Sequence, residues 1–228
     1  HGADGRKCGC DLCKKIKMRR HASRAGTHPH SEEKVRLVKG AHGFGEIAVY
    51  WDVQDYGAEA EYLHGARYDL LGYCITTAVL LSIPMKKKTA TSIKQAVQSR
   101  LGPSESFRWT RSDDAEEIAL GLEALGSKHF PSTPYSPNSN IIERVTLTYN
   151  DMLRMTFAQS GLPPFWRPIV GASAAQQWCI HRQTVRLDID GNQVTRAPNQ
   201  WRHSLNYQPF RQADTLLCGQ LIEVVPPK

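Results

Sequence analysis

The chain has 228 residues, of which 40% are hydrophobic and 22% are charged, and its formal net charge is +7. It is long enough for one hydrophobic core of about 100–150 residues with smaller appendages. No apolar run approaches the roughly 20 residues of a membrane span. The composition therefore favours a globular protein and excludes an integral membrane protein.

An N-terminal arm carries all of the net charge. Residues 1–40 hold 11 Lys/Arg against 4 Asp/Glu, whereas the other 188 residues hold 18 of each sign. Such a basic block is typical of a segment that contacts nucleic-acid phosphates, and the alternatives are a solvated tail and a localisation signal. We expect residues 1–44 to form a basic arm. Its candidate DNA-binding side chains are Lys14, Lys15, Lys17, Arg19 and Arg20.

The cysteines fall into two groups. Three crowd the N-terminus and three lie singly in apolar stretches: Cys8, Cys10, Cys13, Cys74, Cys179 and Cys218. The isolated ones are typical of buried thiols in a reducing compartment. Cys10 and Cys13 have the two-residue gap of a zinc half-site, but no second pair follows at a usual spacing. We expect a partial Zn²⁺ site, completed by downstream histidines or by residues upstream in a longer protein.

The middle of the chain predicts a mixed α/β arrangement. Apolar and β-branched runs predict strands at residues 45–53, 67–76, 78–85, 107–112 and 128–131. Capping residues and apolar periodicity predict four helices, which begin at Thr89 or Thr91, at Asp113 or Asp114, at Asn138 or Ser139, and at residue 165. Gly126 is expected to close the second of these helices and Gly161 the third. Beyond residue 181, alternating and turn-rich sequence predicts further strands.

Three acidic residues carry the functional prediction. Asp52 and Asp113 each end a strand-like run, and Glu143 lies in the first turn of a long helix, so the three are expected to converge. Clustered carboxylates need a counter-charge, and hard oxygen ligands suit Mg²⁺ or Mn²⁺. A two-metal carboxylate site cuts and joins phosphodiester bonds. Asp55 is an alternative to Asp52. The ordinary interpretations are that Asp52 is a surface charge at the end of a strand, that Asp113 caps a helix, and that Glu143 interacts with the helix dipole.

Distinctive motifs surround these carboxylates. Residues 132–144 read Ser-Thr-Pro-Tyr-Ser-Pro-Asn-Ser-Asn-Ile-Ile-Glu-Arg, residues 160–166 read Ser-Gly-Leu-Pro-Pro-Phe-Trp, and Arg111-Ser112-Asp113 precedes both. Together they resemble the integrase of copia-type retrotransposons, within the retroviral-integrase group. The resemblance implies a ribonuclease H-like mixed sheet flanked by helices. Its implied domains are a basic arm with a remnant zinc-binding segment (1–44), a catalytic core (45–180) and the start of a C-terminal β-rich segment (181–228).

The resemblance also implies an activity, which is metal-dependent 3′-end processing and strand transfer of DNA. Asp52, Asp113 and Glu143 match the three catalytic carboxylates, which would hold two Mg²⁺ or Mn²⁺ ions. The further candidate DNA contacts are Tyr135, Asn140 and Arg144. The implied partners are double-stranded DNA and further copies of the chain, without a membrane, in the nucleus or in a cytoplasmic virus-like particle.

The chain departs from the family at several positions. Asp114-Ala115 follows Asp113 where many relatives have Asn-Gly-Gly, and Thr146-Leu147 stands where many have Asn-Arg. The gap of 29 residues before Glu143 is short, and the second strand has Gly72 near the place of a frequent Asp. These changes are expected to weaken DNA binding more than metal binding. The alternatives are a catalytically inactive DNA-binding remnant and, with the same metals, a nuclease or ribonuclease H.

Overall fold

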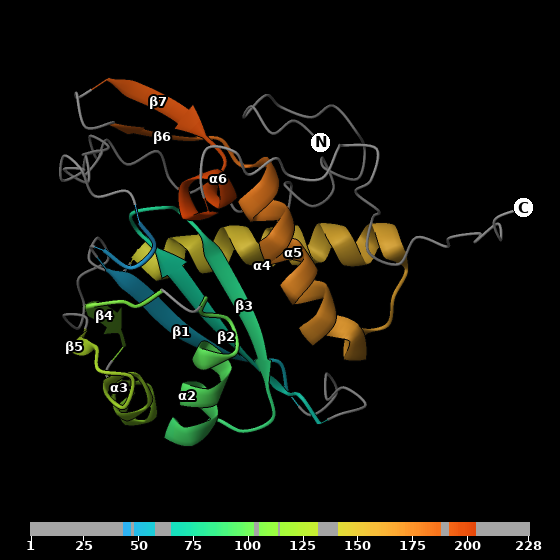
Figure 1. Ribbon diagram of the computed structural model, residues 1–228. Coiled ribbons are helices and arrows are strands. Elements are labelled where there is room, and N and C mark those ends of the chain that lie inside the picture. The colour runs from blue at the N-terminus through green and yellow to red at the C-terminus, as the bar shows by residue number, and fades with distance from the viewer. Residues whose placement is uncertain are drawn as a thin grey trace, which may run out of the picture.

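A five-stranded mixed sheet forms the centre of the protein (Figure 1). The computed structural model describes residues 43–46, 48–57, 65–102, 105–113, 115–131, 141–187 and 192–203. The strands are β1 (Val49–Asp55), β2 (Tyr68–Cys74), β3 (Leu80–Met85), β4 (Trp109–Ser112) and β5 (Lys128–Pro131). Their order is β3-β2-β1-β4-β5, in which β1, β2 and β3 are antiparallel neighbours and β4 and β5 run parallel to β1. This arrangement confirms the predicted mixed α/β class.

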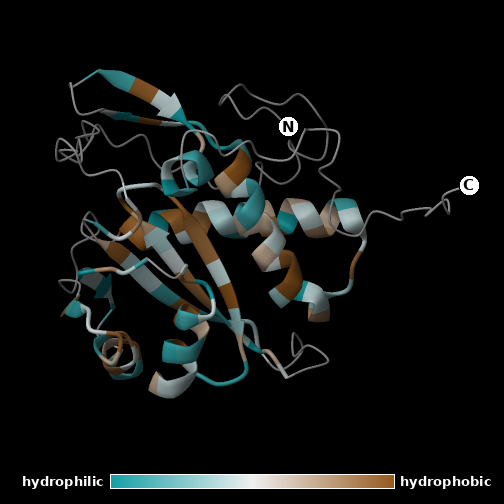
Figure 2. Cartoon of the chain, viewed as in Figure 1, coloured by the Kyte–Doolittle hydropathy of each residue, from teal (hydrophilic) through white to brown (hydrophobic). Residues whose placement is uncertain are grey.

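Helices cover both faces of the sheet (Figure 1). They are α2 (Ala90–Gln98), α3 (Glu116–Glu123), α4 (Ile141–Ser160), the short η2 (Pro164–Trp166) and α5 (Arg167–His181). Helices α2 and α3 pack together on one face, and α4 and α5 pack on the other. Figure 2 shows hydrophobic residues gathered in the central strands and on the adjoining helix surfaces, while much of α2 is hydrophilic. No helix in the described ranges is both long and apolar enough to span a membrane.

Close packing in the core explains the glycine in the second strand. Trp51 is fully buried and lies opposite Gly72 in the β1–β2 register. A Cβ atom on Gly72 would lie 2.5 Å from Cζ3 of the Trp51 ring. On its other side, the Trp51 ring contacts the ring of Phe107, with a centroid distance of 5.8 Å. Gly72 therefore makes room for a large aromatic residue one position before the candidate carboxylate Asp52.

Replacing Gly72 with Ala is expected to destabilise the protein by about 1–3 kcal/mol, because the Trp51 ring has to leave its place in a filled core. The measurement is the free energy of unfolding in urea. Gly102→Ala is a matched control, because the atoms nearest to a Cβ there belong to the Glu105 side chain, the first of them at 3.4 Å. Equal stabilities of the two variants would contradict the packing argument.

The helix boundaries agree in part with the sequence. Thr89 caps α2, and its Oγ1 accepts a hydrogen bond from the Ser92 N–H at 3.3 Å. The expectation that Asp113 or Asp114 caps α3 is wrong, because the N-cap is Ala115 and no side chain caps this helix. Glu116 and Glu117 in the first turn complement the positive helix end instead. The Asp113 side chain is therefore not used as a helix cap.

A small C-terminal unit follows α5. It consists of the antiparallel pair β6 (Thr184–Leu187) and β7 (Gln193–Arg196), and of α6 (Pro198–His203). Arg202 of α6 binds the Glu105 carboxylate through Nε and Nη2, each at 2.6 Å, and donates to the carbonyl of Arg100 at 2.8 Å. Strands were expected throughout this region, so α6 is a correction. Pro198 provides the helical start, and the Gln200 side chain accepts the Ala197 N–H at 3.0 Å.

Candidate active site

The sheet register brings two of the predicted carboxylates level with each other. In the parallel β1–β4 pair, Tyr50 lies beside Arg111. Asp52 and Asp113 each follow one of these partners by two residues, Asp113 just beyond the end of β4, and alternation puts both on the face that bears Tyr50. Helix α4 begins beside this point, and Thr146 Oγ1 donates to Asp52 Oδ2 at 3.4 Å. Glu143 lies one turn earlier on the same helix.

The charges of Asp113 and Glu143 act on the Asp52 carboxylate. Burial is the main cause that raises the pKa of the Asp52 carboxyl above its usual value, and the negative charge of Asp113 comes second. The charge of Glu143 raises this pKa further, whereas hydrogen bonds from the Val53 N–H and the Thr146 hydroxyl lower it. Asp52 is therefore a desolvated carboxylate that has two acidic neighbours within electrostatic reach.

A lysine supplies positive charge nearby. Lys88 pairs with Glu117 at 2.8 Å, and this hydrogen bond is the main cause that raises the pKa of the lysine. The charges of Asp113 and Asp52 raise it as well. Lys88 therefore offsets part of the negative charge at the junction of β1, β4 and α4.

Asp55, the alternative to Asp52, has a different environment. Its carboxylate binds Nε and Nη2 of Arg67, each at 2.7 Å, and accepts the Gly57 N–H at 2.8 Å. The hydrogen bond with Arg67 is the main cause that lowers the pKa of Asp55. Asp55 is thus an exposed, charge-paired residue, whereas Asp52 is the one whose pKa the charges of Asp113 and Glu143 raise.

The donor set suits a divalent metal, although the ligands are not assembled. Within the described residues, no three His, Cys, Asp or Glu side chains come close enough together to hold an ion. Asp113 and Glu143 are exposed, whereas Asp52 is half-buried. Three carboxylates offer the hard oxygen ligands that Mg²⁺ and Mn²⁺ prefer. The residues fit such ions by chemistry, and assembly requires rotation of Asp113 and Glu143.

A cleft continues from the carboxylates along α4. Leu147, Asn150 and Arg154 follow Glu143 at helical spacings of four, seven and eleven residues, so they share one side of the helix. All three line a cleft of about 780 Å³, which Arg167 of α5 also lines. Arg154 pairs with Asp151 at 2.5 Å. The cleft therefore combines apolar side chains with two guanidinium groups and the Asp55 carboxylate.

A buried polar cluster behind this cleft was not predicted. The Asp69 carboxylate is fully buried and accepts hydrogen bonds from Tyr149 at 2.6 Å, from Tyr56 at 3.0 Å and from Ser82 at 2.8 Å. Burial is the main cause that raises the pKa of Asp69, and the three hydroxyls lower it. A Cβ atom on Gly171 of α5 would lie 2.3 Å from the Tyr149 hydroxyl. The cluster therefore ties β2, β3 and α4 together beneath α5.

The remaining predicted residues divide into two sets. Arg144 is exposed on α4 beside Glu143, and Cys74 and Cys179 are buried free thiols, as expected. Burial raises the pKa of the Cys179 thiol to about 11. The other predicted ligands and contacts lie outside the described residues, namely Cys10, Cys13, Lys14, Lys15, Lys17, Arg19, Arg20, Tyr135 and Asn140.

Comparison with known proteins places the fold. No protein-family model and no curated protein sequence matches the chain. A chain of the simian T-cell lymphotropic virus intasome, solved in complex with PP2A regulatory subunit B56 gamma, is similar with a TM-score of 0.54 and 13% identity over 79% of this chain. The match spans only 62% of that intasome chain. The catalytic core domain of BIV integrase gives a TM-score of 0.44 and 14% identity over 71% of this chain and 93% of that one. The first likeness shows that the chain has an integrase-like fold.

Proposed function

We propose that this chain is the catalytic region of a copia-type retrotransposon integrase, which processes DNA 3′ ends and transfers them to a target strand. The observation that carries the proposal is the position of Asp52, whose carboxyl pKa both Asp113 and Glu143 raise. Asp113 follows β4 and Glu143 lies on α4, and the charges of both reach the Asp52 carboxylate on β1. The motifs of residues 132–144 and 160–166 support the copia type in particular.

In this proposal, Asp52, Asp113 and Glu143 hold two Mg²⁺ or Mn²⁺ ions. Such ions, when bound, activate an oxygen nucleophile and stabilise the leaving oxygen of an in-line displacement. Burial and the Thr146 hydroxyl fix the Asp52 side chain, while Asp113 and Glu143 turn toward it. Because its pKa is raised, Asp52 is protonated in a larger fraction of molecules at mildly acidic pH than an exposed aspartate is. Metal binding has to displace that proton.

Other parts of the chain would hold DNA. The cleft along α4 takes a DNA strand next to the carboxylates, where Arg154 and Arg167 offset phosphate charge. The basic arm of residues 1–40 contacts the duplex and accounts for most of the salt dependence of binding. Double-stranded DNA and further copies of the chain are the proposed partners, and the nucleus or a virus-like particle is the proposed location.

The test is an assay of strand nicking and joining with a labelled duplex and Mn²⁺. The wild-type chain is expected to nick and join, and Asp113→Asn is expected to lose both activities because a metal ligand is missing. Glu123→Gln on α3 is the control, because it removes an exposed carboxylate on the opposite side of the sheet. Equal activity of the Asp113→Asn protein and the wild type would refute the proposed site.

The alternative is a DNA-binding remnant without activity. The absence of a preassembled group of metal ligands in the described residues favours it. This alternative predicts that the wild-type chain binds duplex DNA but neither nicks nor joins it with Mn²⁺ or Mg²⁺. The same assay therefore decides between the two functions.

A further inference from the structure

Two aromatic rings lie together at the open edge of the sheet. β5 is an edge strand, and its neighbour is β4. The rings of Trp109 on β4 and Phe130 on β5 have a centroid distance of 5.3 Å and an interplanar angle of 38°. Phe130 is 43% exposed. Trp109 is half-buried against the core, and the exposed Phe130 ring of this pair is available for stacking with a ligand.

Cationic side chains surround these rings. Cζ of Arg108 lies 5.3 Å and Nζ of Lys128 lies 5.6 Å from the centre of the Trp109 ring. Arg111 is exposed and is the sheet partner of Phe130. In the part of the chain that the structure describes, none of these three cations forms an ion pair. We call the set Arg108, Trp109, Arg111, Lys128 and Phe130 the edge patch.

The edge patch lies on the same face of the sheet as the candidate carboxylates. Trp109 and Arg111 alternate with Thr110 and Ser112, which are fully buried on the other face. Arg111 is also the partner of Tyr50 in β1, two residues before Asp52 and on its side. Helix α4 packs against β1 and β2 on this face, so the surface of β4 and β5 extends outward from the carboxylates.

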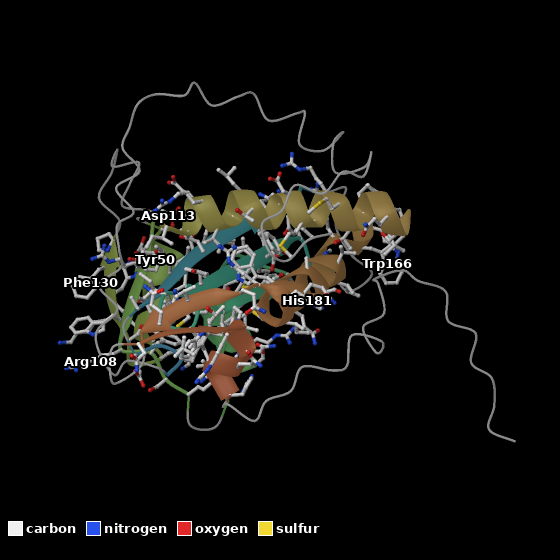
Figure 3. The ribbon with its side chains drawn as sticks, turned by 90° about the horizontal axis from the view of Figure 1, so that it is seen from above. Tyr50, Arg108, Asp113, Phe130, Trp166 and His181 are labelled. Atoms are coloured by element: carbon white, nitrogen blue, oxygen red, sulfur yellow. The ribbon has the colours of Figure 1, made fainter. Side chains whose placement is uncertain are left out.

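The side-chain view agrees with this placement. Figure 3 shows Arg108 and Phe130 pointing outward at one edge of the molecule, with Asp113 on the same side. Trp166 lies at the far end of the molecule in this view. The edge patch is therefore next to the candidate site and remote from the η2 segment.

We propose that the edge patch binds an unpaired nucleic-acid strand and guides it past Asp113. The inference rests on the proposed function and deepens it by naming single-stranded DNA as the ligand of this surface. Stacking on aromatic rings tolerates any base, and Arg and Lys beside the rings offset phosphate charge. The patch itself contains no acidic side chain. A single strand is the occupant because bases inside a duplex do not expose their faces to Phe130.

The test is the affinity of the full chain for a labelled oligothymidylate, measured by fluorescence anisotropy in EDTA over a range of salt concentrations. Phe130→Leu keeps an apolar side chain but removes the ring, and we expect binding at least about fivefold weaker. Lys128→Gln is expected to reduce the slope of log affinity against log salt by about 0.7, which corresponds to one phosphate contact to a single strand. Because Phe130 is half exposed, its replacement is expected to leave the melting temperature nearly unchanged.

Two matched variants control for general effects. Phe165→Leu removes a comparably exposed phenylalanine, 38% exposed, which packs on Trp166 at 6.0 Å on the remote η2 segment. Lys94→Gln removes a lysine from α2, on the opposite face of the sheet. Both are expected to bind as the wild type does. Unchanged binding by Phe130→Leu, an equal loss in Phe165→Leu, or an equal loss of blunt-duplex affinity in Phe130→Leu would overturn the inference.

Failure of this inference is distinguishable from failure of the proposed function. If only the edge patch is wrong, Phe130→Leu binds the single strand normally while the wild type still joins strands with Mn²⁺. If only the catalytic function is wrong, Phe130→Leu loses single-strand affinity in EDTA although no variant joins strands. If Phe130→Leu melts below the assay temperature, the slope of log affinity against log salt for Lys128→Gln tests the edge patch in its place.

Discussion

Replacing Asp52 with Asn is expected to abolish metal-dependent strand joining and, at the same time, to stabilise the metal-free protein. Joining should fall by about a thousandfold or more, because bound metal ions supply several kcal/mol of charge stabilisation. The metal-free protein should gain on the order of 1 kcal/mol, because the substitution removes one like charge from a partly desolvated group. Burial and the charge of Asp113 are the two main causes of the raised Asp52 pKa. Activity and stability thus change in opposite directions.

The pH dependence of stability separates this explanation from a simple packing effect. Because the folded-state pKa of Asp52 is raised, its contribution to stability is fully present below the ordinary aspartate pKa and is lost as pH rises through the folded value. The Asn variant has no such loss. Its advantage, measured by urea unfolding in EDTA, should therefore vanish in acid and be largest near neutral pH.

Asp55→Asn is a control of opposite sign. Arg67 lowers the pKa of Asp55, so this carboxylate contributes stability above its ordinary pKa and loses that contribution as pH falls through the lowered value. Asp55→Asn should therefore gain no stability at neutral pH. The outcome that would contradict the proposed site is an Asp52→Asn protein that joins strands normally or is less stable than the wild type at neutral pH.

The sequence predicted those features that local signals determine. Apolar runs located all five strands of the main sheet, and Thr89 marked the start of α2 by ordinary capping chemistry. The predicted cap of α3 was wrong because an aspartate that follows a strand can either cap the next helix or belong to a functional site. The local sequence is the same in both cases. In the structure Ala115 takes the N-cap position, and the charge of Asp113 acts on Asp52 instead.

Features that depend on distant partners were not predictable. Gly72 appeared to be a departure from a family pattern, but its role depends on the Trp51 ring in the neighbouring strand. Phe130 acquires a partner, Trp109, only when β4 and β5 pair. Asp69 lies in an apolar strand, and its hydrogen-bond partners are 13 and 80 residues away in sequence. No local periodicity contains this information.

Replacing Asp69 with Ala is expected to destabilise the protein by about 3 kcal/mol or more. The carboxylate is the shared acceptor for the hydroxyls of Tyr56, Ser82 and Tyr149. Its removal takes this acceptor away from the buried hydroxyl donors. Each buried polar group left unsatisfied costs about 1–3 kcal/mol, and a cavity adds to this cost. Because Tyr149 belongs to α4, which also carries Glu143, strand joining should fall together with stability.

Asp69→Asn tests whether hydrogen bonding or charge governs this cluster. The amide retains an acceptor for Tyr149, so the variant should be far more stable than Asp69→Ala. Burial raises the folded-state pKa of Asp69, so the wild type loses stability as pH rises from the ordinary aspartate pKa through the raised value. Asp69→Asn should lack this loss and should at least equal the wild type near neutral pH. Equal stability of the Ala and Asn variants across the pH range would show that the cluster does not hold α4 in place, because the hydroxyls would then have other partners.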